Sequence, residues 1–118
     1  MWRHYVLNEL AQEIHQNSVD KGFYEKDRNP YEIWMLINTE IVEAVEAYRD
    51  GFGLNEFAYD RRAEGAFEDK PVGIPSEMAD IFIRGLDACA YWGIDIEKAI
   101  KEKMAYNAKR AYKHGRQH

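Results

Sequence analysis

Acidic side chains recur at every third position of one strongly apolar segment. Glu40, Glu43 and Glu46 lie in TEIVEAVEAY, residues 39–48, where most of the other side chains are aliphatic. Like charges three or four residues apart on a helix repel each other by roughly 0.2–0.5 kcal/mol per pair. This arrangement is therefore stable if the acids face solvent or if they share a bound cation.

A second acidic pair lies farther along the chain, in the sequence SEMAD. Glu77 and Asp80 are three residues apart, which separates them by about 60° around a helix axis. If the two segments form helices that pack side by side, their carboxylates converge in a partly dry site, where divalent cations must offset the repulsion. Carboxylate oxygens are hard ligands that favour Mg²⁺ or Mn²⁺ over zinc or copper.

The alternative interpretation is a solvated face. Surface helices carry acids at such spacings, and Asp80 with Arg84 has the spacing of an ordinary i,i+4 ion pair. Under this interpretation Glu43 and Glu46 face water, and the chain is a non-enzymatic helical oligomerisation or interaction module. A di-iron or di-manganese bundle would require Glu-x-x-His pairs, which the sequence lacks.

Length, charge and cysteine content restrict the class of protein. The 118 residues predict a single domain, residues 1–118. A net charge of −5 argues against a nucleic-acid partner, although the segment from Lys98 onward is locally basic. Cys89 is the only cysteine, which excludes an intrachain disulfide. The first residues lack the uninterrupted apolar stretch that is typical of a signal peptide, and no window approaches the length of a membrane span. We therefore expect a cytoplasmic protein with no membrane partner.

Hydrophobic periodicity predicts an all-α protein, a bundle of four to five helices. We expect the first helix over about residues 3–20. The second should begin at Pro30, with Asn29 as its N-cap, and end at Asp50-Gly51. Residues 52–74 form a long, glycine-bearing connection that is typical of a loop, with one short helix around residues 55–62.

The remaining two helices complete the bundle. Ser76 is expected to cap the third helix, which should end at Gly93. Asp95 should cap the fourth helix, which is expected to end near Gly115. Apolar residues occur on both sides of the second and third helices, which predicts that the bundle is completed by oligomerisation.

The order of the acidic motifs resembles that of a known superfamily. Glu40-Ile-Val-Glu43, a loop of a few dozen residues and Glu77-Met-Ala-Asp80 are similar to the paired motifs of the all-α nucleoside triphosphate pyrophosphohydrolases, which include MazG and the dimeric dUTPases. Four stretches of the chain resemble stretches of MazG-like proteins, in the same order and over about residues 30–115. They are LINTEIVEAVEAYRDG, KPVGIPSEMADIFIR, WGIDIEKAIKEKMAYNAKR and YKHG. The connection between the motifs is longer than in the best-known members.

The resemblance implies a hydrolase that cleaves a (deoxy)nucleoside triphosphate to the monophosphate and pyrophosphate in nucleotide-pool housekeeping, working as a homodimer or homotetramer. Mg²⁺, or Mn²⁺ in its place, would be held by Glu40, Glu43, Glu77 and Asp80. Glu43, with Glu40 as the second candidate, would orient or deprotonate the attacking water. Attack at the α- or the β-phosphorus stays open, as does the preferred base.

Two further sets of residues are candidates for binding the substrate. Lys103, Asn107 and Arg110 match phosphate-binding positions of the family's last helix, and their spacing places them on one helix face. Their alternative role is a solvated basic turn that complements the helix dipole. Trp34 and Asn38 are candidates for stacking on and hydrogen bonding to the base, whereas an aromatic residue at this position is also typical of a core or subunit interface.

Overall fold

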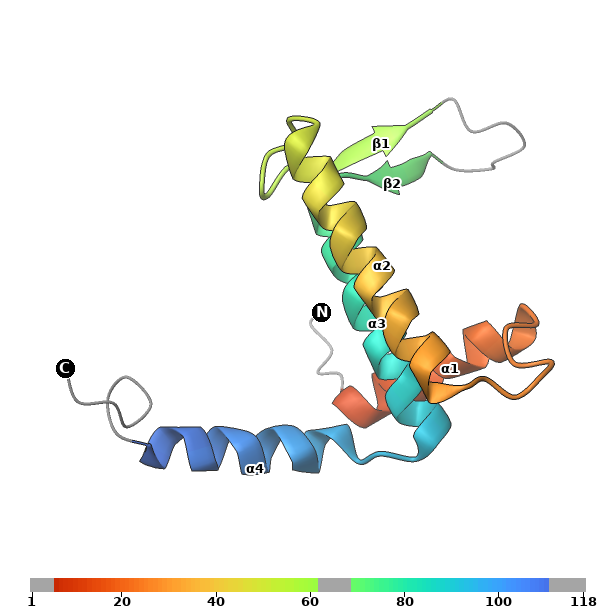
Figure 1. The fold of residues 1–118 in the computed structure, drawn as a ribbon, viewed down its shortest axis with the longest axis vertical. Coiled ribbons are helices and arrows are strands. Elements are labelled where there is room, and N and C mark those ends of the chain that lie inside the picture. Colours follow the sequence, from red (N-terminus) through yellow and green to blue (C-terminus); the bar gives the residue numbers. More distant parts are fainter. Residues whose placement is uncertain (1–5, 62–68, 111–118) are drawn as a thin grey trace, which may run out of the picture.

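Helices dominate the computed structural model, which describes residues 6–61 and 69–110. The described elements are α1 (Leu7–Asp20), α2 (Pro30–Arg49), β1 (Ala58–Asp60), β2 (Lys70–Val72), α3 (Ile74–Trp92) and α4 (Ile96–Lys109). The antiparallel helices α2 and α3 lie side by side, α1 packs across the lower part of α3, and α4 extends away from this group (Figure 1). The mainly helical class predicted from the sequence is confirmed.

The second helix has the ends that the sequence predicts. The side chain of Asn29 accepts a hydrogen bond from the Tyr31 backbone N–H at 2.8 Å, and Pro30 occupies the first turn, where no backbone donor is needed. The helix ends at Arg49, and Gly51 follows with a φ of 95°. These local signals fix the length of α2 and therefore the register of its acidic residues.

The third helix begins earlier than predicted. Gly73 is its N-cap and adopts a φ of 91°, so the chain turns sharply out of β2 and the helix starts at Ile74. A Cβ on Gly73 would lie 3.3 Å from the backbone oxygen of Glu56, so the turn also favours a residue without a side chain. The prediction of Ser76 as the N-cap is wrong, because its hydroxyl donates to the Pro71 carbonyl oxygen at 3.2 Å.

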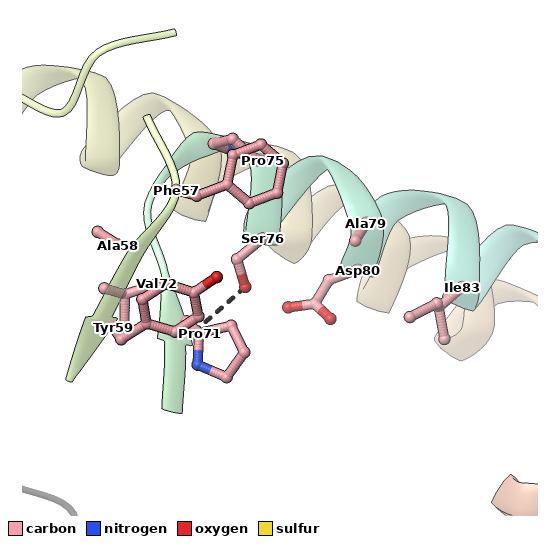
Figure 2. Close-up of a pocket in the computed structure, with 10 residues that line it drawn as sticks. All are labelled: Phe57, Ala58, Tyr59, Pro71, Val72, Pro75, Ser76, Ala79, Asp80 and Ile83. Carbon is pink, nitrogen blue, oxygen red and sulfur yellow. Dashed lines mark hydrogen bonds between the residues drawn. The ribbon is translucent and has the colours of Figure 1, made fainter. Parts of the chain in front are cut away.

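Residues 52–74 contain a hairpin in place of the predicted short helix. β1 and β2 pair antiparallel, with Ala58 opposite Val72 and Asp60 opposite Lys70. The prediction of a helix around residues 55–62 is wrong for the described part of that range, because pairing with a distant segment outweighs a weak local helical pattern. The hairpin lies beside the first turns of α3 (Figure 2).

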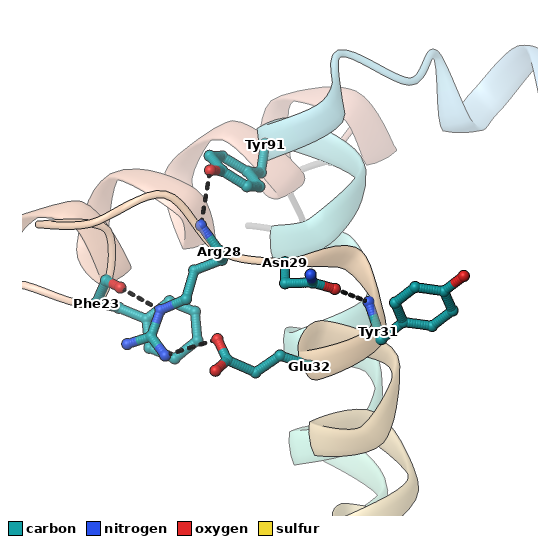
Figure 3. A network of polar contacts seen from close by, with 6 residues as sticks. All are labelled: Phe23, Arg28, Asn29, Tyr31, Glu32 and Tyr91. Atoms are coloured by element: carbon teal, nitrogen blue, oxygen red, sulfur yellow. Dashed lines mark hydrogen bonds and ion pairs between the residues drawn. The ribbon is translucent and has the colours of Figure 1, made fainter.

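The connection between α1 and α2 is fixed by one arginine. The Arg28 backbone N–H donates to the Tyr91 hydroxyl of α3 at 3.1 Å, and its Nε donates to the Phe23 carbonyl oxygen at 2.7 Å (Figure 3). The same guanidinium pairs with Glu32 at 3.0 Å and lies 3.9 Å from the Phe23 ring centroid. These contacts hold the start of α2 against the end of α3.

The outer helices α1 and α4 are linked to each other where α4 begins. α1 begins at Leu7, and the first residues of its predicted range lie outside the described part of the chain. Asp95 accepts from the Lys98 backbone N–H at 3.1 Å, as predicted for the cap of α4, and Asn8 of α1 donates to Asp95 at 2.8 Å. α4 is described as far as Lys109, so its predicted extension to Gly115 lies outside the described residues.

The interior of the chain is thin. Among the described residues, the buried apolar side chains are mostly small: Ala11, Ile33, Ala47, Ile74 and Ala88. The radius of gyration is 17.5 Å, whereas a compact domain of this length has about 13.5 Å. Large apolar side chains are exposed on α2 and α3, including Trp34, Val42, Val45, Tyr48 and Phe82. The isolated chain thus leaves two apolar faces uncovered.

Within residues 6–61 and 69–110, no helix combines the length and the apolar character that crossing a membrane requires.

Candidate metal centre

Three glutamates from two helices meet between α2 and α3. Glu40 and Glu43 lie one turn apart on α2, and Glu77 lies in the first turn of α3. One carboxylate oxygen from each residue lies within 4.8 Å of the other two. Glu46, the third acid of the repeat, is exposed and lies outside this group. The antiparallel packing therefore brings together three of the four predicted metal ligands.

The group is only partly open to solvent. Glu40 is 7% exposed, Glu77 is half-buried and Glu43 is exposed. The Glu77 Oε2 atom is buried and has no hydrogen-bond donor among the described residues. A buried polar atom without a partner costs about 1–3 kcal/mol or more if charged, so this oxygen favours a cation or a proton.

The electrostatics of Glu77 follow from these neighbours. Burial is the largest cause that raises the pKa of its carboxyl group, followed by the nearby Glu43 carboxylate and then by the charges of Asp80 and Glu40. All of these causes disfavour the ionised form, which is the form that binds a metal. A divalent cation would reverse this balance, because it replaces the repulsion among carboxylates with attraction.

The sequence did not reveal the role of Arg84. Its Nε donates to the Glu40 Oε1 atom at 2.8 Å, so this arginine reaches across from α3 to α2. Its side chain is 36% exposed and that of Glu40 is 10% exposed. The i,i+4 spacing suggested Asp80 as its partner, but Arg84 lies on the face of α3 that contacts α2. Arg84 supplies a positive charge to the acidic group within the same chain.

Asp80 lies beside the three glutamates, but its carboxylate is not among the oxygens that lie within 4.8 Å of one another. Burial raises the pKa of its carboxyl group, and so does the charge of Glu40, whereas the charges of Arg84 and Lys70 lower it. The same carboxylate lines a cleft between the hairpin and α3 (Figure 2). Asp80, predicted as the fourth metal ligand, therefore stands between the acidic group and this cleft.

Of the two predicted base-binding residues, Trp34 lies near the start of α2, whereas Asn38 lies two residues before Glu40. Trp34 is 52% exposed, and its ring centroid lies 5.4 Å from that of Trp92, at the end of α3. Asn38 is exposed and contacts the Met35 sulfur at 3.8 Å. Trp34 precedes Glu40 by about 9 Å along the helix axis, and its pairing with Trp92 matches the alternative role in a core or interface.

The predicted phosphate clamp is not brought to the acids within one chain. Lys103, Asn107 and Arg110 are all exposed on or just after α4, which packs against α1 and points away from α2 and α3. Glu77 lies near the start of α3, and the fifteen residues to its end at Trp92 span roughly 22 Å. The clamp and the acids of a single chain therefore lie far apart.

The donor set fits a hard divalent cation. It consists of carboxylate oxygens from two helices, and the buried Glu77 Oε2 atom has no donor within residues 6–61 and 69–110. These three residues offer no sulfur or imidazole ligand, as is typical of Mg²⁺ or Mn²⁺ sites. Comparison of the chain with protein-family models, curated proteins and solved structures finds no match. The assignment of function therefore rests on the geometry of this site.

Proposed function

We propose that the chain is a Mg²⁺-dependent hydrolase that cleaves a nucleoside triphosphate to the monophosphate and pyrophosphate. The observation that carries the proposal is the convergence of Glu40, Glu43 and Glu77, with a buried Glu77 oxygen for which the described part of the chain supplies no donor. The resemblance of the acidic motifs to those of the all-α pyrophosphohydrolases supports the same reaction class. Glu40, Glu43 and Glu77 would hold the metal, and Mn²⁺ would substitute for Mg²⁺.

Each residue of the site has a distinct role in this proposal. A bound Mg²⁺ would neutralise phosphate charge and lower the pKa of a water molecule. Glu43 is the most exposed of the three glutamates, so its carboxylate can orient or deprotonate a water that enters from solvent. Glu40 is held in place by Arg84, and the half-exposed guanidinium can donate to a phosphate oxygen.

The activity can be tested directly by measuring pyrophosphate release from the common ribo- and deoxyribonucleoside triphosphates, with and without Mg²⁺. We expect Mg²⁺-dependent formation of monophosphate and pyrophosphate. Glu43→Gln should reduce turnover by at least a hundredfold, whereas Glu46→Gln, one turn farther along the same helix and outside the group, should retain it. Absence of turnover with every triphosphate would refute the proposal.

We further propose that the working form is a homodimer or homotetramer. The exposed apolar faces of α2 and α3 support this assembly, because surfaces of this kind are normally covered by a partner. In such an assembly the distance between clamp and acids within one chain is no obstacle, because Lys103, Asn107 and Arg110 of one chain would reach the acids of another. A single monomeric mass at micromolar concentration would contradict the assembly.

Mixing two inactive variants tests whether the site is shared. Glu43→Gln removes a metal ligand, and Arg110→Ala removes part of the clamp. If each site combines acids and clamp from different chains, an equimolar mixture of dimers allowed to exchange subunits should recover about a quarter of the parental turnover. If both parts came from one chain, the mixture would stay inactive.

A second candidate function is an interaction module without catalysis. The observation that favours it is the same exposure of Trp34, Val42 and Phe82, which fits a protein partner as well as a second copy. This alternative predicts no effect of Glu43→Gln on function and no response to Mg²⁺, so the turnover assay separates the two candidates.

A further inference from the structure

The hairpin and α3 enclose an open cleft that the three glutamates do not occupy. Its volume is about 360 Å³, within the roughly 300–1,000 Å³ of small-molecule pockets. Phe57, Tyr59 and Val72 on the hairpin side and Ile83 on α3 give it mainly apolar walls (Figure 2). These walls suit a flat ring better than a phosphate group.

The aromatic side chains of the cleft have free surface for stacking. Phe57 and Tyr59 both line the cleft, yet they are 70% and 56% exposed. Exposed aromatic rings of this kind bind nucleobases by stacking, because every base has a π-face. Phe57 directly precedes β1 and Tyr59 lies within it, so one short stretch of chain brings both rings to the cleft.

The polar side chains that α3 contributes to the cleft, Ser76 and Asp80, offer acceptors. Asp80 presents a carboxylate, which only accepts hydrogen bonds when ionised. The Ser76 hydroxyl donates its proton to the Pro71 carbonyl oxygen at 3.2 Å, so its oxygen is left with acceptor capacity. An exocyclic amino group of a base would complement these acceptors, whereas a carbonyl oxygen at the same position would be repelled.

Asp80 also joins the cleft to the acidic group. The charge of Glu40 raises the pKa of Asp80, and the charge of Asp80 raises the pKa of Glu77, so the groups lie within electrostatic reach of one another. A ligand with its ring in the cleft could therefore extend its phosphates toward the three glutamates. Asp80 therefore links the cleft to the candidate metal centre.

We propose that this cleft is the nucleobase subsite and that it selects bases with an exocyclic amino group: adenine, guanine or cytosine. Phe57 and Tyr59 stack on the base, and Asp80 accepts a hydrogen bond from its amino group. The inference rests on the proposed hydrolase function. It assigns Asp80 to binding the base instead of the metal. It also assigns the stacking role to Phe57 and Tyr59 instead of Trp34.

The test compares two Mg²⁺-bound probes by calorimetric titration into the full chain: a non-hydrolysable analogue of cytidine triphosphate, and inorganic tripolyphosphate, which has no base. Ala79 lies on α3, lines the cleft and is exposed, so Ala79→Phe should fill the cleft without disturbing the interior. We expect this variant to bind the nucleotide about ten- to a hundredfold more weakly, with unchanged affinity for tripolyphosphate. Ala79→Ser, which leaves the cleft open, should bind both probes as the parent does.

The outcomes separate the two proposals. Unchanged nucleotide affinity in Ala79→Phe, with both probes still bound, would overturn the base subsite and leave the hydrolase intact. Binding of neither probe to the parent in the presence of Mg²⁺ would overturn the hydrolase and the subsite together.

The selection of the base has its own test. Analogues of cytidine and uridine triphosphate differ where an amino group replaces a carbonyl, so the parent should bind the cytidine analogue roughly tenfold more tightly. Equal affinities would refute the role of Asp80 as the amino-group acceptor.

Discussion

Two acidic side chains of α3, Asp87 and Glu77, differ in what surrounds the negative charge. Asp87 is 6% exposed. One of its oxygens lies 2.8 Å from His15 Nδ1, and the other accepts from the Ser18 hydroxyl at 2.9 Å. Toward the other end of the helix, Glu77 faces two further carboxylates, and its buried Oε2 atom has no donor among the described residues.

The contrast separates a structural anchor from a binding site. Around Asp87, donors from α1 satisfy the buried charge, so the carboxylate ties α1 to α3. Tyr24 belongs to the same network, and its pKa is raised by burial first and then by the charge and hydrogen bond of Asp87. Around Glu77 the neighbours repel, so the charge destabilises the chain until a cation is bound.

The largest effect is expected for the anchor. Asp87→Ala removes the acceptor for His15 and Ser18 and leaves their polar groups partly buried, which should lower the free energy of unfolding by about 3 kcal/mol. Urea denaturation followed by circular dichroism measures the change. Asp20→Ala removes an exposed carboxylate of α1 whose partner is Gln16, and it should stay within about 0.5 kcal/mol of the parent. Equal stability of the two variants would contradict the anchor.

The second effect concerns stabilisation by the metal. Ligand binding at a hundred times the dissociation constant stabilises a folded protein by about 2.7 kcal/mol, so saturating Mg²⁺ should raise the melting temperature of the chain. Glu43→Gln should lose this response, and Glu46→Gln should keep it. A melting curve of metal-free parent protein that does not respond to Mg²⁺ would argue against the site.

The third effect has the opposite sign to the first. In the absence of metal, Glu77→Gln removes a charge that its neighbours repel, so it should stabilise the chain by about 1 kcal/mol. The raised pKa of Glu77 means that the folded state favours the proton, so this contribution to stability is present at low pH and is lost as pH rises from 4.5 through the folded value. Unfolding in EDTA across this pH range should show a larger loss in the parent than in the variant, which keeps only the contribution of Asp80.

The smallest effect is the release of protons when Mg²⁺ binds. Because the pKa values of Glu77 and Asp80 are raised in the metal-free chain, a fraction of a proton should leave as the cation enters. Calorimetric titrations of Mg²⁺ in buffers with different ionisation enthalpies measure this fraction near the raised pKa values. Identical heats in all buffers would show that the acidic group was already ionised.

Local signals in the sequence predicted much of the helical framework. The caps at Asn29 and Asp95 and the stop at Gly93 are observed as predicted, because capping depends on residues within one turn of the helix end. The hairpin and the early start of α3 were not predicted, because they depend on pairing between residues 58–60 and 70–72 and on the turn at Gly73. Short-range periodicity carries no information on such pairing.

The sequence by itself determined which acids share a helix face and that oxygen ligands would favour a hard cation. Only the tertiary structure decided that Glu77 faces Glu40 and Glu43, that Arg84 binds Glu40 across 44 positions of sequence, and that Asp80 lines a separate cleft. The structure also separated the basic face of α4 from the acids of its own chain. The physical reason is that helix faces follow from local spacing, whereas the pairing of faces depends on how distant segments close on one another.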